Sequence, residues 1–278
     1  MQKLQSIDEF FESVARAAQS VLLLDYDGTI APFSPVRERA RPYPGVIECL
    51  QSLVSSGRSR LIMITGRDAR QIPKLLPLHP SPEVWGVHGL QHLHSDGTLE
   101  MTEIPLAADR GLREAAEWLR EQGLQTLTEV KPGSVALHWR SLEPESIAML
   151  RPKIAAAWDA MVRQGLLKIL EFDGGIELLL ARGDKGRAVQ SILSQIGDAV
   201  PLAYLGDDTT DEAAFRALSG RGFTALVRAL PRPTAAQAYL KTPEQLLEFL
   251  ARWQEVTDSD AQLCSRVSES SGRIDAHD

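Results

Sequence analysis

The chain has 278 residues, of which 44% are hydrophobic, and a net charge of −7 at pH 7. The negative charge argues against binding to nucleic acid or to an acidic membrane surface, and two cysteines are too few for a disulfide framework or a zinc site. No apolar run reaches the length of a transmembrane helix, and the acidic N-terminal segment lacks the apolar stretch of a signal peptide. We therefore expect a cytoplasmic, monomeric protein with one large core and a smaller second unit.

The first part of the chain alternates between helices and short apolar strands. Helices are predicted over residues 6–19 and 44–56, and strands over 21–24, 60–64 and 84–87. Three prolines mark residues 30–43 as a loop. This alternation is typical of a parallel sheet covered by helices, as in Rossmann-like α/β folds. Residues 1–106 are predicted to form the first part of such a core domain.

The pattern changes after residue 106. Helices are predicted over 108–122 and 143–164, and strands over 124–130, 135–140, 166–172 and 176–180. We interpret residues 107–182 as an inserted, smaller α/β cap domain.

The core pattern then returns over residues 183–255. Helices are predicted over 184–196, 212–218 and 242–253, and strands over 201–205 and 224–227. The Ser-, Asp- and Arg-rich residues 256–278 show no periodicity, so we predict a disordered tail.

Two carboxylates follow the first predicted strand. Asp25 and Asp27 end the apolar run 21–24, and Gly28 permits a sharp turn directly after them. Ligands of open α/β sheets bind outside the carboxyl ends of the strands, so this strand delivers two acids to the expected site. Buried carboxylates need a compensating cation or hydrogen bonds. The alternative is an acidic turn without function.

A second acidic cluster follows the strand predicted over 201–205. Asp207, Asp208, Asp211 and Glu212 would repel one another without a cation, and a hard divalent ion with oxygen ligands is the natural compensation. The alternative is that these acids cap the following helix and complement its dipole. Two acidic strand ends in one chain favour a shared metal ion, and we predict Mg²⁺.

Two further segments have the chemistry of an anion site. Thr65 and Gly66 offer a hydroxyl and a backbone N–H at the end of the strand over 60–64. Lys185 lies at a helix start, where its ammonium and the helix dipole both favour phosphate. The alternatives are a helix cap for Thr65 and an exposed surface charge for Lys185. The two acidic clusters favour a phosphate site.

These four segments resemble, in order, the four motifs of haloacid dehalogenase-like phosphatases. The resemblance implies that Asp25 attacks phosphorus to form an aspartyl phosphate, and that Asp27 acts as general acid and base. It implies further that Asp25, the main-chain carbonyl of Asp27 and Asp207 hold Mg²⁺. Asp208 is assigned to the same metal site. There, Asp208 and Asp211 would lie beside the metal ligands or contact the ion through a water molecule. Thr65 and Lys185 would neutralise the transferring phosphoryl group.

The predicted cap contains a segment, 129–140, that resembles the Glu-x-Lys…Ser…His-x-Arg segment of trehalose-6-phosphate phosphatases. The resemblance implies hydrolysis of a small sugar phosphate, with side chains that hydrogen-bond the sugar hydroxyls. The expected sugar contacts are Glu129, Lys131 and Glu177, with Arg67, His88, Ser134 and His138 behind them. The alternative for each cap residue is the exposed face of a strand.

The chain departs from this family at two places. Thr65 stands where the family usually has Ser, which keeps the hydroxyl, and Leu90-Gln91 stand where a small residue and an acid are common. The second departure leaves open a phosphatase of another sugar phosphate, such as sucrose-phosphate, a glycosyl-phosphoglycerate or a pseudo-sugar phosphate. Two more distant alternatives are a metal-dependent nucleotide-sugar glycosyltransferase and an inactive sugar-phosphate sensor.

Overall fold

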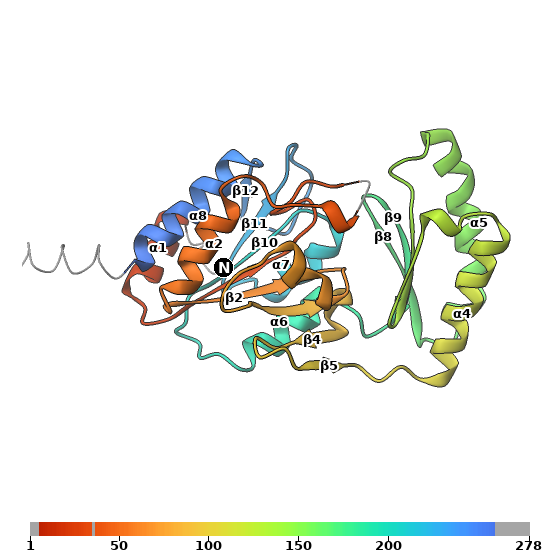
Figure 1. Cartoon of the computed structure of the whole chain (residues 1–278), viewed down its shortest axis with the longest axis horizontal. Coiled ribbons are helices and arrows are strands. Elements are labelled where there is room, and N and C mark those ends of the chain that lie inside the picture. Colours follow the sequence, from red (N-terminus) through yellow and green to blue (C-terminus); the bar gives the residue numbers. More distant parts are fainter. Residues whose placement is uncertain (1–5, 35–36, 259–278) are drawn as a thin grey trace, which may run out of the picture.

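The computed structural model describes residues 6–34 and 37–258, which form two β-sheets with helices packed on them (Figure 1). The larger sheet has the strand order β12-β11-β10-β1-β2-β3-β4-β5. Its strands are β1 (Ser20–Leu24), β2 (Ser59–Ile64), β3 (Glu83–Gly86), β4 (Gln91–Leu93), β5 (Leu99–Met101), β10 (Leu202–Gly206), β11 (Phe223–Val227) and β12 (Ala238–Leu240). The strands from β12 to β3 are parallel, and β4 and β5 extend this edge antiparallel.

Helices cover both faces of this sheet, which explains why its central strands are apolar throughout. Alternate residues of β1 point to opposite faces, so Leu22 and Leu24 join one core cluster and Val21 and Leu23 another. The first face is covered by α1 (Ile7–Arg16), α2 (Val46–Ser55), α3 (Ile72–Leu75) and α8 (Glu244–Thr257), and the second by α6 (Lys185–Leu193) and α7 (Glu212–Ala217). Ser6 and Glu9 form the capping box of α1.

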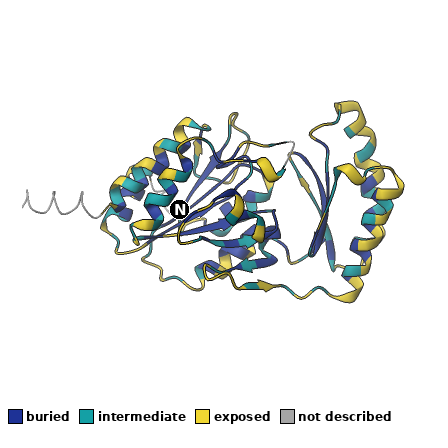
Figure 2. Cartoon of the chain, in the orientation of Figure 1, coloured by how far each residue is buried: buried dark blue, intermediate teal, exposed yellow. Residues whose placement is uncertain are grey.

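The smaller sheet is antiparallel, with the order β6-β7-β9-β8, and lies between β5 and α6 in sequence. Its strands are β6 (Thr128–Lys131), β7 (Ser134–His138), β8 (Leu167–Phe172) and β9 (Gly175–Leu180). Two helices, α4 (Leu106–Glu121) and α5 (Pro144–Val162), pack on one face around Leu119, Ile154 and Trp158. Their outer sides are exposed (Figure 2), and the opposite face of the sheet is turned toward the core (Figure 1). The α/β core with an inserted cap is therefore confirmed.

Within the part of the chain that the structure describes, five 3₁₀ turns connect these elements. They are η1 (Arg37–Arg39), η2 (Ala69–Gln71), η3 (Val87–Gly89), η4 (Gln125–Leu127) and η5 (Thr209–Asp211). Within η3, Val87 and His88 have positive φ angles of 46° and 54°, which are strained for residues with a Cβ. The His88 side chain is buried and contacts Glu177, and such surroundings impose the strained backbone.

The structure differs from the sequence prediction at several elements. Strands β4, β5 and β12 were not predicted, and part of the strand predicted over 124–130 is the turn η4. Helix α8 extends to Thr257, so the chain is still helical at the predicted start of the tail, residue 256. The buried Thr257 hydroxyl donates to the main-chain oxygen of Trp253 at 2.8 Å. Residues 259–278 lie outside the described part of the chain.

Helix α4 begins at Leu106, one residue before the predicted start of the cap. The domain boundaries at 107 and 182 stay a prediction. None of the helices in the described residues is both long enough and apolar enough to span a membrane.

Candidate active site

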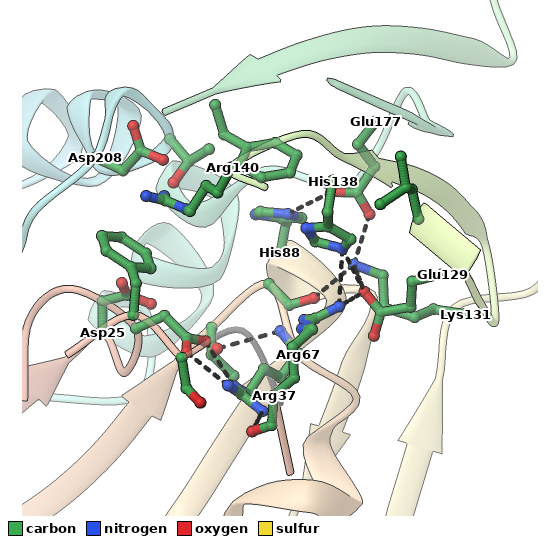
Figure 3. A pocket seen from close by; sticks show the side chains of 18 of the residues that line it. Asp25, Arg37, Arg67, His88, Glu129, Lys131, His138, Arg140, Glu177 and Asp208 are labelled. Carbon is green, nitrogen blue, oxygen red and sulfur yellow. Dashed lines mark hydrogen bonds and ion pairs between the residues drawn. The ribbon is translucent and has the colours of Figure 1, made fainter. Parts of the chain in front are cut away.

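A cavity of about 800 Å³ lies between the carboxyl ends of the core strands and the cap sheet (Figure 3). All predicted site residues except Ser134 line it: Asp25, Asp27, Thr65, Arg67, His88, Glu129, Lys131, His138, Glu177, Lys185, Asp207 and Asp208. They come together because β1 pairs with β2 and β10 in parallel, which places three strand ends at one edge. The Ser134 side chain is fully buried away from the cavity.

Lys185 lies between two carboxylates on the core side of the cavity. Its Nζ is 2.8 Å from Oδ1 of Asp25 and 2.7 Å from Oδ1 of Asp211, and all three side chains are buried. Burial lowers the pKa of Lys185, but Asp211 and Asp25 raise it above its ordinary value. Burial raises the pKa of the Asp25 carboxyl to about 7, although Lys185 acts to lower it. Lys185 is therefore charged and holds Asp25 at the base of the cavity.

Asp207 completes a buried group with Asp25 and Asp211 in which carboxylate oxygens of all three lie within 4.8 Å of one another. The Oδ1 atom of Asp207 is buried and has no hydrogen-bond partner among the described residues. Burial is the main cause that raises the pKa of Asp207 well above its ordinary value, and the negative charges of Asp25 and Asp211 raise it further. Gly28 makes room for this carboxylate, because a Cβ at its φ of +82° would overlap Asp207. The cluster therefore fits a hard divalent cation.

Asp208, which is predicted to act at the metal site next to the ligands or through water, does not belong to this cluster. Its two oxygens accept hydrogen bonds from the backbone N–H of Asp173, at 3.2 and 3.0 Å, and it caps η5 through Thr209. Asp173 lies in the turn between β8 and β9, so Asp208 joins the core to the cap. The acid that the structure places beside Asp25 and Asp207 is Asp211.

Asp27 and Arg67 form a two-point ion pair beside this cluster. The Arg67 Nε and Nη2 atoms each donate to one oxygen of Asp27 at 2.6 Å, and Arg67 is almost fully buried. The Thr65 hydroxyl oxygen accepts from the Arg67 backbone N–H at 3.2 Å. Arg67 is predicted to lie behind the sugar contacts, and in this structure it donates to Asp27 and to the main-chain oxygen of Arg37.

Lys131, Glu177 and His88 form a second buried network on the cap side. The Lys131 Nζ is 2.8 Å from Oε1 of Glu177, and the His88 Nε2 is 3.0 Å from Oε2 of the same carboxylate. Lys131 also donates to the main-chain oxygen of Gly66 at 2.9 Å. Burial alone would raise the pKa of Glu177, but Lys131 and His88 lower it well below its ordinary value. These contacts join β6 and β9 of the cap to the ends of β2 and β3.

Arg37 is a cavity residue that the sequence analysis did not identify. It belongs to η1, in the proline-rich loop after β1, and its guanidinium forms an ion pair with Glu129 and contacts the His138 Nε2 at 2.9 Å (Figure 3). Burial is the main cause that lowers the pKa of His138 to about 3, and the positive charges of Arg37 and Lys131 act in the same direction. A loop offers no periodicity from which its contacts could be predicted, and its partners are about a hundred residues away.

A second contact of the same loop involves Phe33 and Arg140. The Arg140 guanidinium lies 3.4 Å from the centroid of the Phe33 ring, and both side chains line the cavity. Phe172 lines it too and packs edge-on against His138. The loop after β1 and the cap sheet therefore close one side of the cavity.

Known proteins that are similar to this chain in sequence and in fold agree with the architecture and the cavity described above. The chain is 30% identical over 250 residues to the trehalose-phosphate phosphatase of Mycobacterium ulcerans. The aligned region covers 83% of this chain and 60% of the relative. The chain thus spans about 60% of the length of that relative. Among solved structures, it is similar to the C-terminal domain of trehalose-6-phosphate phosphatase from Candida albicans, with a TM-score of 0.73 at 19% identity. That match covers 88% of this chain and 95% of the other.

A haloacid dehalogenase-like hydrolase from Bacteroides thetaiotaomicron has the same fold, with a TM-score of 0.61 at 14% identity. The match covers 84% of this chain and 99% of that one. Residues 23–244 match the family model described as trehalose-phosphatase. This span runs from β1 into α8 and includes every acid, lysine and cap residue of the cavity. The chain therefore belongs to the trehalose-phosphatase family and has the haloacid dehalogenase-like fold.

Proposed function

We propose that the chain is a Mg²⁺-dependent phosphatase that hydrolyses trehalose 6-phosphate to trehalose and phosphate through an aspartyl-phosphate intermediate. The observation that carries this proposal is the Asp25–Lys185 ion pair, at 2.8 Å, at the base of a cavity whose opposite wall is the polar face of the cap. A cavity of about 800 Å³ is within the usual size for small-molecule sites. The substrate class is that of the trehalose-phosphate phosphatases to which the chain is similar.

Asp25 is the proposed nucleophile. One of its carboxylate oxygens bonds to phosphorus while the bond from phosphorus to the sugar oxygen breaks. Asp27 gives a proton to that leaving oxygen, then takes one from the water that attacks the aspartyl phosphate and releases Asp25. Asp27 is held by Arg67 beside the cavity, so Arg67 is a positioning residue for it. Lys185 and the Thr65 hydroxyl stabilise negative charge on the phosphoryl group.

Asp25 and Asp207 are the side chains proposed to hold the Mg²⁺ ion, together with the main-chain oxygen of Asp27. The ion would neutralise phosphate charge so that an anionic nucleophile can approach. Asp211 is a neighbour and not a ligand in this proposal, because both of its oxygens already accept hydrogen bonds from Lys185, Tyr204 and the backbone.

The sugar is proposed to contact the cap residues that face the cavity. Glu129 and His138 are partly exposed to it, whereas Lys131 and Glu177 are nearly fully buried in their own ion pair. We therefore assign direct sugar contacts first to Glu129 and His138, and a supporting role to Lys131, Glu177 and His88. Ser134 is too deeply buried to reach the sugar in this arrangement.

The departure at Leu90-Gln91 does not reach the cavity. Leu90 is buried with the cap's apolar residues, close to Gly133, and its main-chain oxygen accepts from Thr102 at 2.8 Å. The Gln91 side chain is buried too, and it accepts from the Ala69 N–H and donates to Asp68. Neither side chain lines the cavity. This departure therefore gives no reason to prefer another sugar phosphate.

The test is phosphate release from trehalose 6-phosphate, glucose 6-phosphate and sucrose 6-phosphate, each measured with Mg²⁺ and after EDTA treatment. We expect turnover to favour trehalose 6-phosphate, to stop with EDTA and to return with Mg²⁺ but hardly with Ca²⁺. The matched control is Asp25→Asn, which preserves the shape of the side chain and should lower the rate by several orders of magnitude.

Two results would contradict the proposal. Equal or better turnover of the other sugar phosphates would overturn the substrate assignment. Asp25→Asn activity above about a tenth of wild type, a barrier change below about 1.4 kcal/mol, would overturn the covalent mechanism. The cytoplasmic location and the monomeric state remain predictions from the sequence.

A further inference from the structure

A histidine pair lies on the antiparallel edge of the core sheet, outside the cavity. His92 belongs to β4 and His94 directly follows the end of this strand, two residues further along, so both point to the same side of the sheet. Their ring centroids are 3.9 Å apart. Glu100 lies opposite His92 in the register of β4 and β5, and its Oε1 atom is 3.1 Å from the His94 Nε2. One ligand atom from each of these three residues lies within 4.8 Å of the others.

We propose that His92, His94 and Glu100 form a second metal site, for Zn²⁺ or a chemically similar d-block ion. Two imidazoles and one carboxylate are typical ligands of such ions, with water completing the coordination. Mg²⁺ prefers oxygen ligands alone, so this site would not compete for the ion of the phosphatase cavity.

The spacing of the ligand atoms suits a tetrahedral ion. Bonds of about 2.0–2.1 Å place the ligand atoms of a tetrahedral zinc ion about 3.3 Å apart. The His94–Glu100 separation of 3.1 Å is already close to this value. An ion between these two side chains would replace their direct contact, and a ligand atom of His92 lies within 4.8 Å of both.

Glu83 provides the support that metal-binding histidines usually have. Its Oε1 atom is 2.8 Å from the His92 Nε2 and also accepts from the Trp85 indole at 3.0 Å. If the His92 Nε2 donates to Glu83, the lone pair of the ring is on Nδ1 and can bind a metal. The Trp85 ring stacks on His92 with centroids 4.2 Å apart, which fixes the plane of the imidazole.

The site is open to an ion from solvent. The His92 side chain is only 11% exposed, but His94 is 34% and Glu100 68% exposed. Glu100 belongs to β5, the last core strand before the chain crosses to α4 and the cap (Figure 1). A bound ion would therefore link β4 to the edge strand from which the cap connection leaves.

Zinc titration of the full chain by calorimetry, with Mg²⁺ present in excess, tests the proposal. We expect wild type to bind one equivalent of Zn²⁺ that His94→Gln loses, or binds at least tenfold more weakly. Glu100→Gln should weaken the same step, whereas Glu103→Gln, an exposed acid three residues further along, should leave it unchanged. The thermal midpoint should rise with Zn²⁺ in wild type and in Glu103→Gln only.

Tryptophan fluorescence gives a readout that is independent of phosphatase activity. Cu²⁺ at this site would quench Trp85, so we expect partial quenching in wild type and its loss in both His94→Gln and Trp85→Phe. Identical Zn²⁺ binding by wild type and His94→Gln would overturn the proposal, as would the absence of Zn²⁺ binding by wild type. His94 and Glu100 are exposed enough that their variants should fold, and circular dichroism would verify this.

Discussion

Asp211 shows how much one buried carboxylate can organise without reacting itself. Its two oxygens accept hydrogen bonds from the Lys185 ammonium, the Tyr204 hydroxyl and the backbone N–H groups of Asp207 and Asp208. Four donors match the acceptor capacity of an ionised carboxylate. The sequence predicts Asp211 near the metal or at a helix start, and in the structure Asp211 ends η5 and directly precedes α7. That it positions Lys185 follows only from the three-dimensional arrangement.

Asp211→Asn is expected to damage both activity and stability. An amide turns one acceptor oxygen into a donor that faces other donors, so Lys185 loses its fixed position beside Asp25. Phosphate release from every substrate should fall, and the free energy of unfolding should decrease by about 1–3 kcal/mol. Steady-state kinetics and urea denaturation measure the two effects. The exposed Asp198→Asn is the matched control, and unaltered kinetics in Asp211→Asn would contradict the positioning role.

His138 gives a prediction about pH. Burial, Arg37 and Lys131 lower its pKa from 6.5 to about 3. Between these values the unfolded chain takes up a proton at His138 and the folded chain does not, so stability falls as the pH decreases below 6.5. Relative to His138→Gln, wild type should lose about 1 kcal/mol between pH 7 and pH 5, since partial exposure weakens the effect.

Urea unfolding of wild type and His138→Gln at pH 7, 6 and 5 measures this difference. Parallel pH dependences of the two proteins would show that His138 is not held neutral by its surroundings.

At the scale of elements, the sequence predicts best where burial on both faces leaves a simple pattern. The strands β1, β2 and β10 are apolar runs, and each ends in the polar residues of the site. The strands β4, β5 and β12 have only three residues each and mix polar with apolar side chains. Their backbone pairing with a neighbouring strand makes them strands, and a pattern within one segment cannot indicate such pairing.

Strand β6 places two of the predicted sugar contacts in different environments. Glu129 and Lys131 lie on the same face of the strand, but the Lys131 side chain is 5% exposed and the Glu129 side chain 19%. Lys131 is the ammonium partner of the buried Glu177. Spacing along a strand predicts a shared face, but it does not show which residue is needed for folding and which is free to contact a ligand.

Lys131→Met should therefore act mainly on stability. It leaves Glu177 buried without its ammonium partner, and breaking a buried pair in this way costs about 3–5 kcal/mol. Lys168→Met removes a half-exposed lysine that lies 3.6 Å from Asp184, and it should cost below about 1 kcal/mol. Chemical denaturation compares the two variants directly. Equal losses would mean that the Lys131–Glu177 pair contributes no more than a surface contact.

At the scale of the whole molecule, the proposed function divides reaction and recognition between core and cap. The residues proposed to react could be identified from motifs at the strand ends, because each motif lies within a few residues of chain. The contacts that close the cap on the core join distant segments, as Arg37 with Glu129 and Asp208 with Asp173 do. Such pairs depend on the relative placement of the two sheets, which no local pattern of residues determines.

Glu129→Gln tests this division. Turnover of trehalose 6-phosphate should fall about tenfold to a hundredfold, since a lost charged hydrogen bond costs roughly 1–3 kcal/mol. Hydrolysis of p-nitrophenyl phosphate should hardly change, because this small substrate needs only the core residues. Lys185→Ala is the contrasting variant and should damage both reactions. Equal losses of both activities in Glu129→Gln would mean that Glu129 acts on closure or folding and not on the sugar.

The contacts that Leu90 makes with both ends of the inserted cap bear on how a core with such an insertion can evolve. The chain leaves the core at Thr102, whose N–H bonds to Leu90, and returns at Gly183, where a Cβ would lie 3.2 Å from the Leu90 Cγ. The two ends of the insertion thus meet at one residue of the core. A segment with adjacent ends can be exchanged for another, or for a short loop, without breaking the parent sheet. Substrate range could therefore change in evolution by replacement of whole caps, while the phosphate chemistry beneath is inherited intact.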